Sequence, residues 1–214
     1  MTNRGADPNG ARQYSLWDMS ASDSAAAAVI DSGSTGDPAT FLPLAVLEER
    51  LRALDTPRDT GRVAMIVRRG PGGRREMLDR VKLAPASGIP GDSWGRRAGR
   101  SPESQLTVIQ ADVAALIANG QPLALFGDNL YLDLDLSNGN LPTGSRLRAG
   151  TVTFEISPLP HNGCQKFDAR FGNDALKFVS RRDLRHRNLR GVYMTVVDGG
   201  EVSAGDEVTV LSRP

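Results

Sequence analysis

The sequence contains one cysteine and two histidines, which limits the metal and redox chemistry that it can support. A single cysteine excludes an internal disulfide and a metal site built from cysteines alone. A zinc site needs several ligands, and Cys164, His161 and His186 with scattered carboxylates match it poorly. A cysteine protease also needs an oriented base and an oxyanion hole, and nothing else in the sequence resembles a protease motif.

Long apolar runs and an excess of one charge are also missing. Lys and Arg total 26 against 25 for Asp and Glu, whereas domains that bind nucleic acid usually carry a clear basic excess. The apolar run at 25–30 is far too short to span a membrane, and it follows Asp18 and Asp23 rather than the basic region of a signal peptide. Both Gly-rich nucleotide signatures, G-x-x-x-x-G-K-S/T and a strand-linked G-x-G-x-x-G, are absent. We therefore expect a cytoplasmic protein that binds neither nucleic acid nor a membrane.

Turn residues, in contrast, are abundant, with 23 Gly and 13 Pro. This composition favours a β-rich architecture over a helical bundle. Short strand-like runs lie between the turns, at 61–67, 76–83, 105–109, 129–136, 151–156, 192–197 and 207–211. The pattern predicts a mainly β fold, a closed or nearly closed β-barrel with a few peripheral α-helices.

Three of these runs carry more detailed expectations. The run 129–136 alternates leucines with Tyr131 and acidic residues, which predicts a strand with one buried face and one solvent face. The run 76–83 is expected to return as one strand beside the run 61–67. The stretch 192–211 has the pattern of a terminal β-hairpin.

Arginines flank the turn of the first predicted hairpin, as Arg68-Arg69 and Arg74-Arg75. The hairpin would gather these four positive charges at one end. Such clusters are usually solvated, although an anion can bind there. Together with a second arginine cluster at 181–190, they support one non-enzymatic alternative, an anion-binding β-barrel module.

The chain divides into three parts. Residues 1–40 are rich in Ala, Ser, Gly and Asp, which predicts a mobile or loosely docked arm. Residues 41–57 are predicted to form an amphipathic helix that ends at Pro57. Its leucines recur at helical spacing, as Leu44, Leu47, Leu51 and Leu54. Residues 58–214 are expected to form the β-barrel domain.

The only cysteine, Cys164, lies in a stretch at 158–172 that is predicted to be a loop built by two prolines and a Pro-His-Asn-Gly turn. We expect the thiol to be accessible there. Positive charge on Lys166, and on His161 if it is protonated, would favour the thiolate. Gly163 leaves room for a ligand beside the sulfur.

A thiolate in this setting could bind a soft metal, carry a persulfide or attack an electrophile. With one cysteine and two histidines in the sequence, the best match is a metal held by one protein thiolate, with its other ligands from an organic cofactor. Arginines would then bind the anionic parts of the cofactor. The Gly-rich stretch 87–100 supplies candidates in Arg96, Arg97 and Arg100.

Seven short motifs follow one another over most of the chain. They are Gly88-Ile-Pro-Gly91-Asp92 with Arg97, Gln105-Leu-Thr-Val-Ile, Gly127-Asp128-Asn129, Leu141-Pro-x-Gly144, Gly163-Cys164-x-Lys166-Phe167, Arg190-Gly191-Val192-Tyr193 and Gly205-Asp206. Their joint order and spacing resembles the MOSC domain, the molybdenum cofactor sulfurase C-terminal domain.

The resemblance implies a β-barrel and a role tied to the molybdenum cofactor (molybdopterin). In family members the cysteine that matches Cys164 handles sulfur or coordinates molybdenum. Relatives include the sulfurase C-terminal domain, the mitochondrial amidoxime-reducing components and small stand-alone bacterial proteins, and some of these reduce N-hydroxylated compounds. Pyridoxal phosphate is a further family-level association.

The sequence departs from the family pattern in three motifs. One is the Gly-Asp loop, which lacks the histidines seen in several bacterial relatives, so their substrate is not carried over. The sequence also has Gly127-Asp128-Asn129 where the family often has Gly-Glu-Asn, which keeps the carboxylate, and Gly163-Cys164 where the family often has Pro-Cys. One cysteine cannot hold an iron–sulfur cluster. A reductase of this type would therefore need separate electron-transfer proteins.

The resulting hypothesis is an oxidoreductase for a small-molecule substrate, with Cys164 as catalytic residue and molybdenum ligand. Arg96, Arg97 or Lys166 would hold the pterin phosphate, and Asp92 and Asn129 would shape the pocket. The full set of predicted cofactor-binding residues is Asp92, Arg96, Arg97, Asn129, His161 and Lys166. The alternative is a sulfur carrier that receives a persulfide on Cys164 from a cysteine desulfurase.

Overall fold

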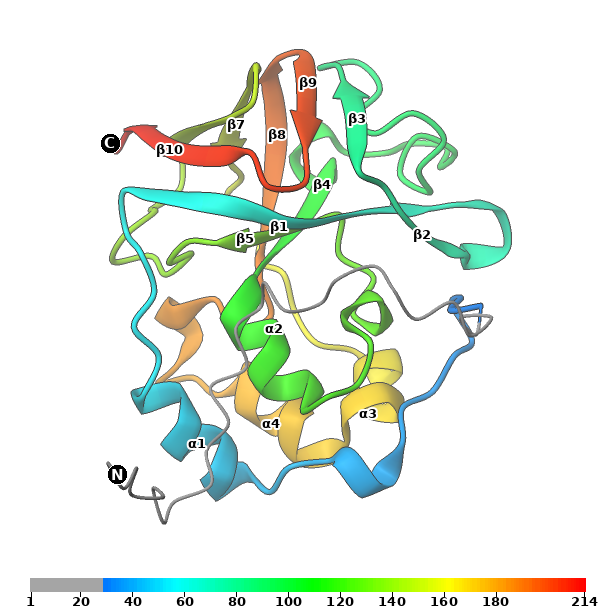
Figure 1. The fold of residues 1–214 in the computed structure, drawn as a ribbon, viewed down its shortest axis with the longest axis vertical. Coiled ribbons are helices and arrows are strands. Elements are labelled where there is room, and N and C mark those ends of the chain that lie inside the picture. The colour runs from blue at the N-terminus through cyan, green and yellow to red at the C-terminus, as the bar shows by residue number, and fades with distance from the viewer. Residues whose placement is uncertain (1–28) are drawn as a thin grey trace, which may run out of the picture.

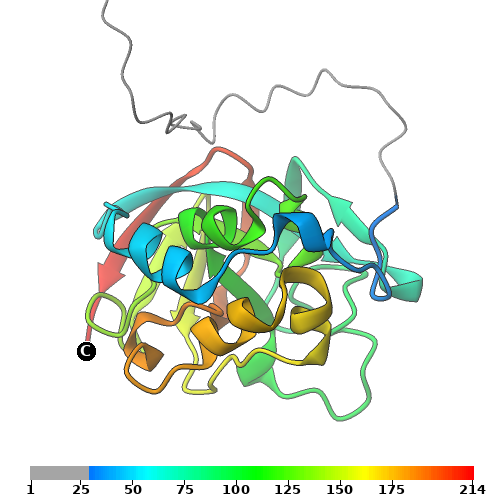
Figure 2. The same cartoon turned by 90° about the horizontal axis from the view of Figure 1, so that it is seen from below.

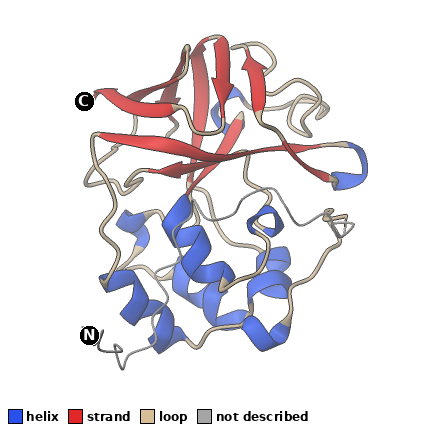
Figure 3. Ribbon diagram, in the orientation of Figure 1, coloured by secondary structure: helices blue, strands red, loops and turns tan. Residues whose placement is uncertain are grey.

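The computed structural model describes residues 29–214, and within them strands and helices occupy separate halves of the molecule (Figure 1, Figure 3). Seven strands close into a barrel. They are β1 (Thr60–Arg69), β4 (Leu106–Gln110), β5 (Leu130–Asp133), β6 (Arg146–Ala149), β7 (Val152–Ile156), β8 (Val192–Asp198) and β10 (Glu207–Ser212). Their order is β10-β6-β7-β8-β4-β5-β1, and pairing of β10 with β1 closes the ring. The predicted mainly β barrel with peripheral helices is confirmed.

Neighbouring strands of the ring are antiparallel, except β4 and β5. These two are parallel, and the chain between them forms α2 (Ala111–Ala118). Parallel neighbours need a crossover connection, and α2 lies in it.

Three short strands lie outside the ring. They are β2 (Arg75–Met77), β3 (Arg80–Leu83) and β9 (Gly200–Ser203). The prediction of one return strand at 76–83 is wrong, because a bend at Asp79 separates β2, which pairs with β1, from β3, which pairs with β9. The predicted terminal hairpin is also wrong, because β9 pairs with β3 while β10 pairs with β6 and β1.

The barrel wall is buried on both faces where helices cover it. All five residues of β4 are buried, with Val108 in the core inside the barrel and Ile109 in a second core between the barrel and the helices. Tyr131 of β5 is fully buried in the second core, and its hydroxyl donates to the carbonyl of Leu123 at 2.7 Å. The solvent face predicted for the run 129–136 is therefore wrong at Tyr131.

Helices pack beneath the barrel in Figure 1, and Figure 2, which is seen from below, shows them in front of it. They are α1 (Leu44–Arg52), α2, α3 (Gln165–Phe171) and α4 (Asn173–Ser180). The predicted leucine face of α1 buries Leu47 and Leu51, and burial of each leucine contributes about 1.5–3 kcal/mol. The helix ends at Arg52, earlier than the predicted stop at Pro57. No helix within residues 29–214 is long and apolar enough to cross a membrane.

The segment 30–41 lies against α3 and β2. The amide of Gly36 donates to the carbonyl of Ala169 at 3.0 Å, and the amide of Arg75 donates to the carbonyl of Ile30 at 2.7 Å. This segment belongs to the arm predicted at 1–40, of which residues 1–28 lie outside the described part of the chain.

Candidate functional site

A cavity of about 350 Å³ lies between the barrel wall and α3, and Cys164 lines it. Its volume is within the range of small-molecule sites. Another hollow, of about 490 Å³, lies over β6 and β10, but it opens widely to solvent and its lining contains neither cysteine nor histidine. The cavity at Cys164 is therefore the candidate site.

The thiol is held by the start of α3. Cys164 precedes the first residue of the helix, and its carbonyl accepts the amides of Phe167 at 2.8 Å and Asp168 at 3.2 Å. Phe167 and Phe171 are buried one helical turn apart and pack on Phe126, with ring centroids 5.7 and 4.2 Å away. This packing anchors the helix, while the side chain of Cys164 stays exposed.

The prediction of a loop throughout 158–172 is wrong in its second half, where α3 lies. The missed signal is the spacing of Phe167 and Phe171, followed by Gly172 at the helix end. The accessibility predicted for Cys164 is confirmed.

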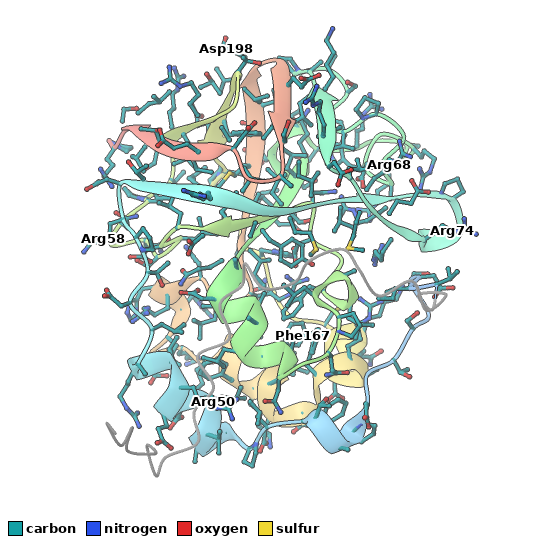
Figure 4. All side chains as sticks on the ribbon, in the orientation of Figure 1. Arg50, Arg58, Arg68, Arg74, Phe167 and Asp198 are labelled. Atoms are coloured by element: carbon teal, nitrogen blue, oxygen red, sulfur yellow. The ribbon has the colours of Figure 1, made fainter. Side chains whose placement is uncertain are left out.

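Seven basic side chains line the cavity, against one carboxylate, that of Asp128. The basic residues are Arg69, Arg75, Arg96, Arg97, Lys166, Arg170 and Arg190. The strand register places Arg69 opposite Arg75 on β1 and β2. Figure 4 shows Arg68 and Arg74 on this same hairpin, as predicted for the arginine cluster. Such a concentration of positive charge favours an anionic ligand.

Asp92 and Asn129 are buried beside Arg69 and do not line the cavity. The carboxylate of Asp92 accepts hydrogen bonds from Arg69, with Nη2 at 2.7 Å and Nε at 3.1 Å. It also accepts a hydrogen bond from Nδ2 of Asn129 at 3.1 Å. Burial alone would raise the pKa of Asp92, but Arg69 and the amide of Trp94 outweigh burial and lower it. Both predicted residues therefore orient Arg69 from outside the cavity.

The predicted residues Arg96, Arg97 and Lys166 all line the cavity and are exposed. Arg96 donates to the carbonyls of Arg69 at 2.9 Å and Gly70 at 2.8 Å. Arg96 thus ties its own loop to the hairpin, while Arg97 and Lys166 present charge at the cavity edge.

Arg75, which is half-buried, and Arg170, which is buried, carry positive charge into the cavity wall. The pKa of each is lowered, mainly by burial. Arg75 packs against Gly127, and its Nε has no hydrogen-bond partner among the described residues. Arg170 donates to the carbonyls of Leu125 at 2.8 Å and Ser32 at 3.1 Å, so it joins α3 to the segment 30–41.

Asp128, Arg190 and His161 form a buried polar cluster in the cavity wall. Nη1 of Arg190 donates to Oδ2 of Asp128 at 2.7 Å. Burial raises the pKa of Asp128, while Arg190 acts in the opposite direction. Burial, and then the charges of Arg190 and Arg69, lower the pKa of His161 well below its usual value. His161 is therefore neutral at pH 7 and supplies no positive charge to Cys164.

Besides Asp128, which belongs to one of the sequence motifs, four basic lining residues were not predicted as site residues. They are Arg69, Arg75, Arg170 and Arg190. The signals for Arg69 and Arg75 were their place in the predicted arginine cluster, and Arg190 belongs to one of the sequence motifs. Arg170 gave no signal, because its position was interpreted as loop.

Fold and site together define a class: a closed β-barrel domain whose single exposed thiol lies in a cationic cavity. Residues 95–209 match the MOSC domain. This match covers more than half of the sequence, and the chain belongs to the MOSC domain family. The predicted family is confirmed.

Two solved structures with TM-scores above 0.5 have the same fold. A crystal structure described as a hypothetical protein has a TM-score of 0.53 and 21% identity, over 73% of this chain and 69% of that chain. The YUAD protein from Bacillus subtilis has a TM-score of 0.52 and 15% identity, over 73% of this chain and 98% of that chain. YiiM from Escherichia coli gives a TM-score of 0.49 and 21% identity, over 72% and 71% of the two chains. A comparison with curated protein sequences gives no significant match.

Proposed function

We propose that the protein binds a molybdenum cofactor in the Cys164 cavity and reduces N-hydroxylated compounds, with Cys164 as the protein ligand of molybdenum. The observation that carries this proposal is one exposed thiol in a cavity lined by seven basic side chains. The MOSC family is associated with this cofactor, which makes it the first ligand to test.

The donor set fits such a cofactor. Thiolates suit soft metals, and a metal whose remaining ligands come from an organic dithiolene needs a single protein sulfur. Cys164 can supply that sulfur without rearrangement, because its side chain is already exposed at the cavity.

The basic side chains fit the anionic part of the cofactor. Arginine recognises phosphate through paired N–H donors. Arg75 has a buried Nε without a partner among the described residues, which a ligand oxygen would satisfy. Arg97 and Lys166 are exposed at the cavity and would complete the phosphate contacts.

The cofactor would supply two-electron redox chemistry, and the chain's own residues would bind and orient it. Cys164 would fix the metal, and Arg69, held by Asp92, would present a fixed charge to the ligand. Electrons would come from a separate electron-transfer protein.

The test is the metal and pterin content of the full chain, purified from a host that makes the cofactor. We expect near-stoichiometric molybdenum and pterin in the wild type, and a loss of molybdenum of about tenfold or more in Cys164→Ala. Lys177→Ala, on the exposed face of α4, is the control and should leave both contents unchanged. Neither metal nor pterin in the wild type would overturn the proposal.

A sulfur carrier is the second candidate, because the same exposed thiol is open to a partner enzyme. After incubation with a cysteine desulfurase and its substrate, intact mass would show one added sulfur atom on the wild type and none on Cys164→Ala. An unchanged mass in the wild type would remove this candidate.

A further inference from the structure

Two buried polar atoms in the cavity wall face each other without a partner. Oδ1 of Asp128 and Nδ1 of His161 are 3.8 Å apart. Neither has a hydrogen-bond partner among the described residues, and the two side chains are only 1% and 8% exposed. Both residues line the cavity that contains Cys164. Buried polar atoms in proteins are nearly always paired, so these two atoms point to a ligand.

Their positions are fixed by the surrounding residues. Arg190 holds the other oxygen of Asp128 at 2.7 Å, and the ring of His161 packs on Tyr193 with centroids 4.7 Å apart. A separation of 3.8 Å is too long for a direct hydrogen bond. One ligand atom at about 2.8 Å from each would bridge them.

The chemistry of the two atoms selects that ligand atom. Oδ1 of Asp128 serves as a hydrogen-bond acceptor, because the carboxylate forms an ion pair with Arg190, whose Nη1 donates to Oδ2 at 2.7 Å. We assign the proton of neutral His161 to Nδ1, because a lone pair there would face the carboxylate of Asp128 at 3.8 Å. The bridging atom must therefore donate one hydrogen bond and accept another. A hydroxyl does both, whereas an ammonium only donates and an ether oxygen only accepts.

We propose that Asp128 and His161 form a hydroxyl-binding subsite that recognises the N–OH group of the substrate. The identity of the ligand class rests on the proposed function; the donor–acceptor pair itself rests on the geometry alone. Water can bridge the two atoms in the free protein, and a substrate hydroxyl replaces it with the same two hydrogen bonds. Both residues act in specificity and positioning.

The test compares two ligands that differ at this one group: benzaldehyde oxime and its O-methyl ether. Binding to the full-length chain is measured by calorimetry or ligand-observed NMR. The oxime hydroxyl can donate a hydrogen bond to the carboxylate of Asp128, and the O-methyl ether cannot. The wild type should therefore bind the oxime about tenfold to a hundredfold more tightly than the ether. His161→Phe keeps an aromatic ring against Tyr193 but removes the donor, and Asp128→Asn replaces the acceptor charge. Both variants should bind the two ligands with affinities within about threefold of each other.

His186→Phe is the matched control, because His186 is exposed and lies outside the cavity lining. It should retain the wild-type preference for the oxime. Thermal denaturation checks that each variant is folded; if Asp128→Asn does not fold, His161→Phe carries the test. Absence of a preference in the wild type, or an unchanged preference in His161→Phe, would overturn the proposal.

Molybdenum content of the same samples separates this inference from the proposed function. Discrimination that depends on His161 in a protein that never acquires metal would support the subsite and contradict the cofactor. A metal-loaded protein without discrimination would support the cofactor and contradict the subsite.

Discussion

At the scale of single residues, Asp92 acts on the cavity from outside it. Its carboxylate fixes the guanidinium and the backbone amide of Arg69, and Asn129 fixes the carboxylate in turn. The charge that Arg69 presents to a ligand is therefore oriented before any ligand binds, which reduces the entropy lost on binding.

Asp92→Asn should lower the free energy of unfolding at pH 7 by about 2–4 kcal/mol, because it leaves the buried Arg69 charge without its counter-ion. The pKa of Asp92 is lowered in the folded protein. Its contribution is therefore complete above the pKa of an unfolded aspartate, about 3.9, and is lost as the pH falls through the lower folded value.

Denaturant unfolding of wild type and Asp92→Asn, at neutral pH and then at decreasing pH below about 4, checks this prediction. Asp198→Asn is the control, because Asp198 is exposed at the end of the barrel remote from α3 (Figure 4). A stability difference that stayed constant as the pH fell would contradict the assigned role of Asp92.

Gly127 shows a separate requirement of the site. Its φ of +74° lies in the left-handed region, and a Cβ there would lie 2.6–2.8 Å from the guanidinium of Arg75. Gly99 has a φ of +64° with nothing within 4 Å of its Cβ position, so Gly99→Ala measures the backbone cost alone. Gly99→Ala should cost about 1–2 kcal/mol. Gly127→Ala should cost more and should also lower the pterin content, because Arg75 must move.

Thermal denaturation and pterin fluorescence of the two variants provide the comparison. Equal stability and equal pterin content in Gly127→Ala and Gly99→Ala would mean that the position of Arg75 does not matter to the site.

At the scale of elements, α3 connects three parts of the site. It begins beside Cys164, its phenylalanines pack on Phe126, and Arg170 reaches the carbonyls of Leu125, Ser32 and Ser34. The segment 30–41 is therefore held by the same helix that holds the thiol.

Arg170→Met should loosen the segment 30–41, because it removes the donors to its carbonyls while keeping much of the side-chain volume. Hydrogen–deuterium exchange of this segment is expected to rise about tenfold or more, while exchange in β4 stays at the wild-type rate. Lys177→Met on α4 serves as the control. Unchanged exchange in segment 30–41 would show that other contacts hold it.

The elements that the sequence predicted well are those whose periodicity matches their burial. The leucine repeat of α1 and the apolar run of β1 fall close to the observed helix and strand. Periodicity gave the wrong exposure for residues that are buried by elements distant in the sequence. Tyr131 alternates with leucines as a solvent-facing residue would, but Leu123 and the helices bury it. Likewise, Asp79 turns the chain from one sheet to another without a strong turn signal.

In the candidate site too, some residues could be predicted from local sequence and others could not. Local sequence was enough to predict that Cys164 is exposed. It was also enough to choose Arg96, Arg97 and Lys166, which line the cavity. It was not enough to predict the contribution of Arg170, because that contribution depends on a helix that follows a proline-rich loop.

At the scale of the whole molecule, charge is distributed unevenly. The chain has a net charge of +1, yet its candidate site carries seven basic side chains and one acidic side chain. Whole-chain composition therefore gave no indication of a strongly anionic ligand. The barrel supplies β1, β4 and β8 as a rigid wall, and the helical half supplies the thiol, so the cavity lies at the boundary between the two halves (Figure 1).

The central claim is that Cys164 ligates molybdenum, and the single cysteine of the chain allows a direct test. Selenocysteine incorporated in place of cysteine labels this position alone. X-ray absorption at the selenium edge of the molybdenum-loaded protein should then show a molybdenum neighbour at bonding distance. A protein that contains stoichiometric molybdenum but shows only light atoms around selenium would contradict the claim.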